Sequence, residues 1–147
     1  MLPTARFSEV HEVLATLAPT TANGTVAQHN TEWFDIAEFH RVFFLLHVGT
    51  PAGASTIDLD IYEATDTDGS DTQIIATKSI TQIVAADAGV YVGIEIRSEE
   101  LDVNDKFHCL RGELTVGTTA YTYSLVAFGF VPRYADCDVT GYDELVP

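Results

Sequence analysis

Basic residues are scarce in this chain. Lys and Arg number 7 against 22 Asp and Glu, so the 147-residue sequence carries a formal net charge of −15. Nucleic-acid binding depends on cations that neutralise phosphates, and docking on an anionic membrane needs basic clusters. The shortage of basic residues therefore argues against both partners. A partner with a basic protein surface fits this negative charge better. The alternative is that the acidic surface has no partner and only keeps the protein soluble.

Long apolar runs and a secretory leader pattern are also missing. No run reaches the roughly 18 apolar residues of a membrane span, and the first residues lack the basic, apolar and small-residue order of a signal peptide. We therefore expect a soluble protein made in the cytoplasm. A chain of 147 residues fits one domain, which can bury a full hydrophobic core without disulfide staples.

Cysteine is rare, with Cys109 inside a strand-like pattern and Cys137 near the end of the chain. Because a reducing compartment keeps thiols free, we expect two free thiols here. The sequence leaves a disulfide between them open.

Helical periodicity is weak, whereas alternation of polar and apolar residues is frequent. The clearest case is the segment 56–63, where Ile57, Leu59 and Ile61 alternate with Asp58 and Asp60, as in a strand with one wet face. Further strands are expected at 39–48, 73–84 with a bulge, 90–97, 106–116 and 120–131. Within the last two, Gly112 predicts a bulge and Gly129 a close approach of another group.

The first 22 residues fit a helical and an alternating pattern equally well, and the surrounding strands favour an edge strand or an arm. About eight strands with short turns and little or no helix predict an all-β fold, an antiparallel β-sandwich that is jelly-roll-like. Other sandwich topologies stay open because sequence patterns do not fix strand order. We expect one domain, with an N-terminal arm or edge strand at 1–30, the β-sandwich at 31–132 and an acidic C-terminal tail at 133–147.

Patterns typical of catalysis or of a bound cofactor are missing as well. His40 and His47 are an odd number of positions apart, and His108 and Cys109 are neighbours in an expected strand, so each pair is expected to face opposite sides. No Gly-x-Ser-x-Gly elbow occurs, and neither cysteine has a catalytic signature around it. We therefore expect no zinc or iron centre, no cofactor and no enzymatic activity.

One acidic loop carries three closely spaced aspartates. Asp66, Asp68 and Asp71 lie in a stretch that resembles a calcium-binding loop, but Gly69 and the twelfth position do not match the EF-hand pattern. A solvated hairpin loop is the favoured interpretation, and the three carboxylates stay weak candidates for a surface cation.

The strand expected at 120–131 is apolar on both faces. Tyr121, Tyr123 and Leu125 point one way, and Val126, Phe128 and Phe130 point the other. Such a strand is covered on both sides, by the second sheet and by a tail, an arm or another subunit. Another subunit is the favoured cover, and a sugar-binding row of exposed aromatic rings is the alternative.

Several short motifs resemble small structural proteins of tailed bacteriophages. They are WFD at 33–35, FHRV at 39–42, Leu59 followed by EATD at 63–66, EELDV at 99–103, KF at 106–107, LR at 110–111, LTVGT at 114–118 and FGFVPRYA at 128–135. The resemblance implies a capsid decoration, or cement, protein: a virion protein that binds the major capsid protein on the outside of the shell and stabilises it. Such proteins often form trimers, which makes a further copy of this chain the second expected partner.

The expected contacts to these partners lie in the arm at 2–17, in the tail at 133–146 and on the two-sided strand. The candidate contact residues are Phe7, Val10, Trp33, Tyr121, Tyr123, Phe128, Phe130, Arg133 and Tyr134. A carbohydrate-binding module displayed on the virion and a head-tail connector or tail structural protein are the alternative functions. Location across the shell or at one vertex distinguishes the last of these from a decoration protein.

Overall fold

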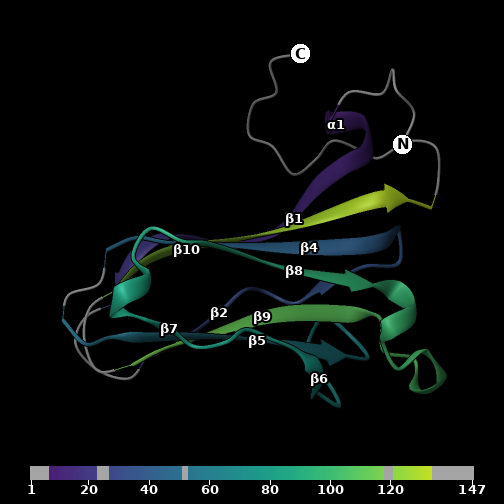
Figure 1. Cartoon of the computed structure of the whole chain (residues 1–147). Helices are drawn as coiled ribbons and strands as arrows, with labels where there is room; N and C mark the ends of the chain where they lie inside the picture. Colours follow the sequence, from purple (N-terminus) through teal and green to yellow (C-terminus); the bar gives the residue numbers. More distant parts are fainter. Residues whose placement is uncertain (1–6, 23–26, 51–52, 118–120, 134–147) are drawn as a thin grey trace.

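Two antiparallel sheets form the protein, stacked face to face (Figure 1). The computed structural model describes residues 7–22, 27–50, 53–117 and 121–133. Sheet A contains β1 (His11–Ala22), β4 (Phe39–Val48), β8 (Tyr91–Arg97) and β10 (Tyr121–Pro132). Sheet B contains β2 (Ala27–Asn30), β5 (Thr56–Ala64), β6 (Gln73–Ser79) and β9 (Cys109–Val116), with the two-residue strands β3 (Phe34–Asp35) and β7 (Ile83–Val84).

The strand order identifies the sandwich as a jelly roll. Sheet A has the order β1-β10-β4-β8 and sheet B the order β2-β9-β5-β6. Among these eight main strands, the first pairs with the last, the second with the seventh, the third with the sixth and the fourth with the fifth. This nested antiparallel pairing is that of a long hairpin rolled into two sheets. The prediction of an all-β, jelly-roll-like sandwich is therefore confirmed.

Alternation along the strands separates the core from the two outer faces. On β5, Ile57, Leu59 and Ile61 are at most 1% exposed and face sheet A, while Asp58 and Asp60 lie on the outer face. The core between the sheets includes Val42, Phe44, Leu46, Ile57, Leu59, Ile61, Ile94, Ile96, Leu110, Leu114, Val116, Tyr121, Tyr123 and Leu125. The alternation of polar and apolar residues in the sequence thus corresponds to alternating outward-facing and buried positions, as expected for an antiparallel sheet with one face in the core.

The N-terminal segment is both helical and extended. Phe7–Val10 form α1, a single helical turn, and the chain then enters β1, an edge strand of sheet A. The second strand, β2, is an edge strand of sheet B and also lies within the segment 1–30. The sandwich thus begins at His11 and not at residue 31, because β1 and β2 are paired members of the two sheets.

Two of the local expectations for glycines have different outcomes. The β5–β9 register runs without a shift past Gly112, so no bulge lies there. A Cβ at Gly112 would lie 2.9 Å from Leu125 and 3.2 Å from Phe44, which shows that the residue allows the opposite sheet to pack closely. At Gly129 the expected close approach is confirmed, because a Cβ there would meet the ring of Phe39 at 2.6 Å.

The remaining segments are short connections. The segment expected as one bulged strand at 73–84 is divided into β6 and β7, with an irregular register opposite Asp60 and Tyr62. Three single-turn 3-10 helices, η1 (Ala85–Asp87), η2 (Ser98–Glu100) and η3 (Val103–Asp105), lie before and after β8. Among the described residues, no helix has the length and hydropathy needed to cross a membrane.

Candidate functional site

The outer face of sheet A carries large apolar side chains in adjacent rows. Phe43 on β4 lies opposite Phe128 on β10, and Leu45 lies opposite Val126 in the next row. Phe130 follows on β10, opposite Arg41. All of these apolar side chains remain partly exposed. We call the set Phe43, Leu45, Val126, Phe128 and Phe130 the apolar face.

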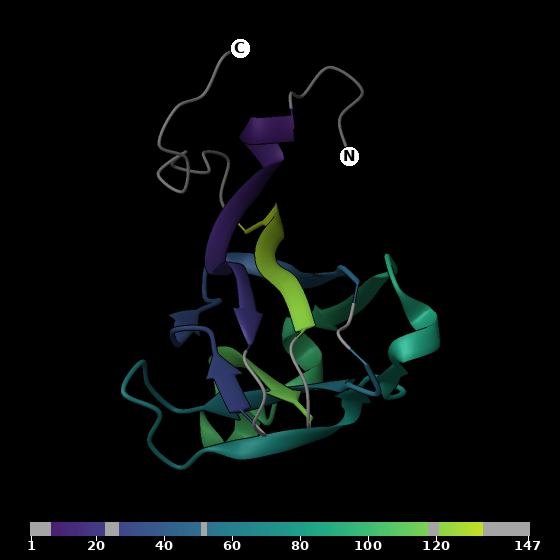
Figure 2. The same ribbon diagram turned by 90° about the vertical axis from the view of Figure 1, so that its left-hand side faces the viewer.

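The N-terminal turn extends this surface. In both views α1 lies on the side of sheet A that points away from sheet B (Figure 1 and Figure 2). The Phe7 ring stacks on His11 with 4.0 Å between ring centroids and meets Phe128 edge-on at 6.3 Å. Phe7 is nevertheless 60% exposed. Together with Phe43, Leu45, Phe128 and Phe130, Phe7 and His11 line a hollow of about 360 Å³ whose walls are almost wholly apolar.

Polar and aromatic side chains on β4 and β8 border the apolar face. Arg41 donates to Glu95 at 2.9 Å, an exposed ion pair between the two strands. Tyr91 stacks on His47 with 4.4 Å between centroids and is 69% exposed. An apolar centre with a polar border is the usual composition of a protein contact surface.

The outer face of sheet B has the opposite character. Its central cation is Arg111, which donates to Glu113 at 3.1 Å and lies over the rings of Trp33 and Tyr62, 4.7 and 5.7 Å from their centroids. Glu113 also lies directly opposite Asp60 on β5. Burial, followed by the charge of Glu113, raises the pKa of the Tyr62 hydroxyl. One outer face is therefore apolar and the other is polar and largely acidic.

Five of the predicted contact residues lie on or near surfaces in the described structure. Phe7, Phe128 and Phe130 come together around the hollow on sheet A, and Val10, at the end of α1, is partly exposed. Trp33 lies beside Arg111 on the other sheet.

The other candidates lie elsewhere. Arg133 is exposed at the end of β10, where its backbone N–H donates to Glu38 and its side-chain Nε to the carbonyl of Phe39. Tyr134 lies outside the described residues. Tyr121 and Tyr123 point into the core and are 0% and 2% exposed. They offer a partner no surface, because the face of β10 that carries them is the one covered by sheet B.

The acidic loop between β5 and β6 is held by its own carboxylate. Asp66 accepts hydrogen bonds from the backbone N–H groups of Asp68 at 3.0 Å and Ser70 at 2.9 Å. The hydrogen bonds from Ser70 are the main reason that the pKa of Asp66 lies below its usual value. Asp68 and Asp71 are exposed. One of the three candidate cation ligands is thus already used to fix the loop.

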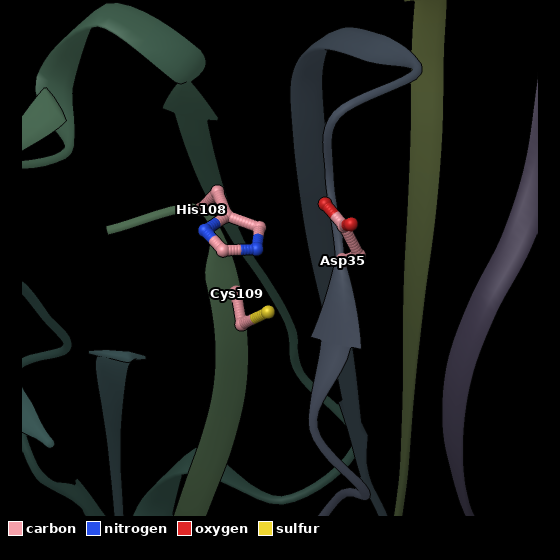
Figure 3. A group of neighbouring side chains, drawn as sticks. All are labelled: Asp35, His108 and Cys109. Atoms are coloured by element: carbon pink, nitrogen blue, oxygen red, sulfur yellow. The ribbon is translucent and has the colours of Figure 1, made fainter. Parts of the chain in front are cut away.

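Sequence spacing gave the wrong arrangement for His108 and Cys109. The donor atoms of Asp35, His108 and Cys109 all lie within 4.8 Å of one another (Figure 3). His108 and Cys109 were expected on opposite sides of one strand, but β9 begins at Cys109, so strand alternation does not apply to His108. Cys109 is a free thiol without solvent exposure, and Cys137 lies outside the described residues.

The environment of the Cys109 thiol disfavours the thiolate. Burial is the main cause, and the nearby carboxylates of Asp35 and Asp66 add to it, which raises the pKa of Cys109 to about 11. A thiol in such surroundings is a poor nucleophile at neutral pH.

Phe43 and Leu45 of the apolar face are absent from the predicted contact residues, although the sequence pattern of their strand could have indicated them. Phe43 and Leu45 occupy alternate positions in a strand whose other positions, Val42, Phe44 and Leu46, are fully buried. A strand of ten residues that is apolar at both parities indicates cover on both faces, just as in β10.

No protein-family model and no curated protein matches the chain. Among solved structures, it is similar to a chain in the structure of the infectious bursal disease virus Gx strain, with 13% identity and a TM-score of 0.49, over 85% of this chain and 33% of that one. It is also similar to a chain of the cowpea mosaic virus top component, naturally occurring empty particles, with 9% identity and a TM-score of 0.48, over 97% and 95% of the two chains.

A third similar structure is that of the CBM22-1-GH10 modules of Clostridium thermocellum xylanase 10B complexed with xylohexaose. It has 9% identity and a TM-score of 0.43, over 88% of this chain and 29% of that one. This chain thus spans about a third of the bursal disease virus chain it matches. At these identities and TM-scores, the matches do not indicate a function.

Proposed function

We propose that this protein is a structural component of a virus particle: a decoration protein that binds the outside of a bacteriophage capsid as a trimer and stabilises the shell. The observation that carries the proposal is the apolar face with its neighbouring hollow on sheet A. A sheet that is already packed against a second sheet on one side has no fold-related need for phenylalanine rings on the other. The rings are explained if a partner covers them.

The occupant of the apolar face is a further copy of this chain. A closed ring of three copies places one surface of each subunit against a different surface of the next, so the apolar face is one half of such a contact. The outer face of sheet B is suited to face the solvent, because the carboxylates of Asp58 and Asp60 favour contact with water. This difference between the two faces orients each subunit in the assembly, with the outer face of sheet A toward a neighbouring copy and that of sheet B toward solvent.

Stabilisation of the shell follows by mass action and needs no catalysis. A subunit that binds only the intact shell lowers the free energy of that state by an amount set by its concentration and affinity. The same contact repeats at every equivalent position, so modest individual affinities add up over the particle. A stiff scaffold keeps the contact geometry constant, and the four hydrogen-bonded strands β1-β10-β4-β8 of sheet A supply such a scaffold.

The first test is self-association. Phe128→Ser removes one partly exposed ring from each contact. Full burial of such a side chain contributes about 1.5–3 kcal/mol, and because the ring is already partly buried in the single subunit, association gains about half of this, or about 1 kcal/mol. We therefore expect the dissociation constant to rise roughly fivefold. Sedimentation velocity across a concentration series measures it. The control is Ile74→Ser, which removes a 44% exposed apolar side chain from sheet B. A wild-type chain that stays monomeric at every concentration contradicts the trimer.

The second test is made on particles. Particles from which the protein has been removed are heated beside particles to which wild-type protein or the Phe128→Ser variant has been added back, and released DNA is measured. We expect DNA release at a lower temperature without the protein and only partial recovery with the variant. DNA release that does not depend on the protein contradicts the stabilising role. Antibody labelling of the protein on particles, viewed by electron microscopy, shows where it lies. Label at a single vertex, and not over the whole shell, favours a connector or tail protein.

Sugar binding is a second candidate, and one observation favours it. Tyr91 is the most exposed of the large hydrophobic side chains in the described residues, and its ring is stacked on His47 on an outer face. The row of rings that a sugar platform needs is shortened, however, because Tyr121 and Tyr123 are buried. A glycan array probed with wild type and with Tyr91→Ala decides the matter, since a signal that Tyr91→Ala abolishes supports sugar binding.

A further inference from the structure

Asp35, His108 and Cys109 meet where β3 pairs with the start of β9 in sheet B. Asp35 lies directly opposite Cys109 in the antiparallel β3–β9 pair. The backbone N–H of Ile36 donates to the carbonyl of His108 at 3.0 Å, and the N–H of His108 donates to the carbonyl of Ala64 on β5 at 3.2 Å. The three side chains therefore stand on backbone that is hydrogen-bonded together, and their proximity does not depend on a loose loop.

The imidazole of His108 is already oriented for a ligand. Its Nδ1 lies 2.8 Å from the carbonyl oxygen of Lys106, to which it donates, so the unprotonated nitrogen of the neutral ring is Nε2. Histidines that bind metal ions commonly donate their other ring N–H to a carbonyl or a carboxylate in this manner. The close-up shows the His108 ring and the Cys109 sulfur on the side of their segment that faces Asp35 (Figure 3).

The carboxylate of Asp35 is also held in place. One of its oxygens, Oδ1, accepts the backbone N–H of Ala37 at 2.7 Å, which fixes the side chain and leaves the second oxygen available. Cys109 has no solvent exposure, whereas Asp35 and His108 are exposed. An ion can thus approach from the solvent side and reach a sulfur ligand at the bottom of the site.

The distances fit the coordination sphere of a small transition-metal ion. Bonds of about 2.0–2.3 Å at tetrahedral angles place nitrogen, oxygen and sulfur ligands about 3.3–3.6 Å apart. Donor atoms within 4.8 Å of one another need side-chain rotations that move them by about 1 Å. A thiolate, an imidazole and one carboxylate form a set that favours zinc and its neighbours over calcium or magnesium, which prefer oxygen ligands.

We propose that Asp35, His108 and Cys109 bind one divalent transition-metal ion of the zinc class, with water as the fourth ligand. On binding, the Cys109 S–H bond breaks, a metal–sulfur bond forms and the proton passes to solvent. The ion joins β3, which pairs through only two residues, to β9 in the middle of sheet B. It acts as a structural clip and is independent of the apolar face.

Cobalt(II) is the probe, because its visible absorption reports ligand type and geometry. The full-length chain is treated with a chelator, dialysed and titrated with Co²⁺. We expect one equivalent to give a sulfur-to-cobalt charge-transfer band and the d–d bands of a tetrahedral site, and Zn²⁺ to bleach both. The variants Cys109→Ser and His108→Gln should each lose the charge-transfer band or weaken binding at least tenfold.

Two controls separate this site from other thiols and histidines. Cys137→Ser removes the second cysteine of the chain, and His40→Gln removes another exposed histidine; both should leave the cobalt spectrum unchanged. If the buried substitution Cys109→Ser prevents folding, His108→Gln still tests the site, because it changes an exposed side chain and should leave the fold intact. Circular dichroism checks this. The absence of a one-to-one cobalt complex overturns the proposal, and so does a spectrum that His108→Gln leaves unchanged or Cys137→Ser abolishes.

Discussion

Gly129 allows the buried ring of Phe39 to lie directly against β10, and replacing it with alanine tests how rigid this contact is. A Cβ at position 129 would lie 2.6, 2.7 and 2.8 Å from three atoms of the Phe39 ring. Carbon atoms in favourable contact lie about 3.5–4.0 Å apart, so the ring must move by about 1 Å. Phe39 is 2% exposed, which means that this movement has to be absorbed inside the core.

The backbone of Phe39 has little freedom to follow the ring. Its N–H donates to Ile36 at 3.0 Å, its carbonyl accepts from Arg133 Nε at 3.2 Å, and it is paired with Pro132 across the strands. Overpacking a close-packed core of this kind costs about 1–3 kcal/mol. For a domain of this size, about 2 kcal/mol lowers the melting temperature by roughly 4–8 °C. Urea unfolding and differential scanning calorimetry measure the two quantities.

A double-mutant cycle shows whether Phe39 is the cause. In the background Phe39→Leu the aromatic ring is gone, and Gly129→Ala should then be neutral or stabilise by about 0.5–1 kcal/mol, since glycine weakens a strand interior. We therefore expect a coupling energy of about 2–3 kcal/mol between the two positions, within the range for residues in contact. The reasoning is refuted if Gly129→Ala destabilises equally in both backgrounds.

Two further predictions concern buried and capping carboxylates. Glu63, 5% exposed, accepts the backbone N–H of Asp102 at 3.0 Å, so Glu63→Ala should leave that donor unpaired and lower the free energy of unfolding in urea by about 1–3 kcal/mol, with Glu63→Gln as the milder control. Hydrogen bonding from the N–H of Arg97, followed by that from Lys78, lowers the pKa of Glu100 below 4.5. The stability from this group is full above pH 4.5 and is lost as the pH falls through the folded-state pKa; acid unfolding of Glu100→Gln that is identical to wild type contradicts this.

The sequence predicted the strands well because their polarity alternates with burial. On β5, the parity of Ile57, Leu59 and Ile61 determines both the strand and its buried side. On β10, both parities are apolar, so the pattern predicts the strand but does not tell which side faces the core. The pattern therefore places Tyr121 and Tyr123 among the surface candidates, whereas both are buried.

The side-chain cluster at the β3–β9 junction was beyond the reach of sequence spacing for a different reason. It depends on the pairing of Asp35 with Cys109, two residues that are far apart in the chain. It also depends on where β9 begins, since a strand that started one residue earlier would turn His108 away from Cys109. Periodicity describes neighbours along a strand and contains no information on which distant strand lies opposite.

The two proposed sites lie in different sheets, which makes them separable by experiment. Phe128 is on the outer face of sheet A, whereas His108 precedes β9 of sheet B. Mutations more than about 7–10 Å apart without shared partners act independently. Phe128→Ser should therefore weaken self-association and leave the cobalt spectrum intact, and His108→Gln should do the reverse. If removal of the metal ion also dissociates the oligomer, the ion belongs to the subunit contact, and the apolar face alone does not explain assembly.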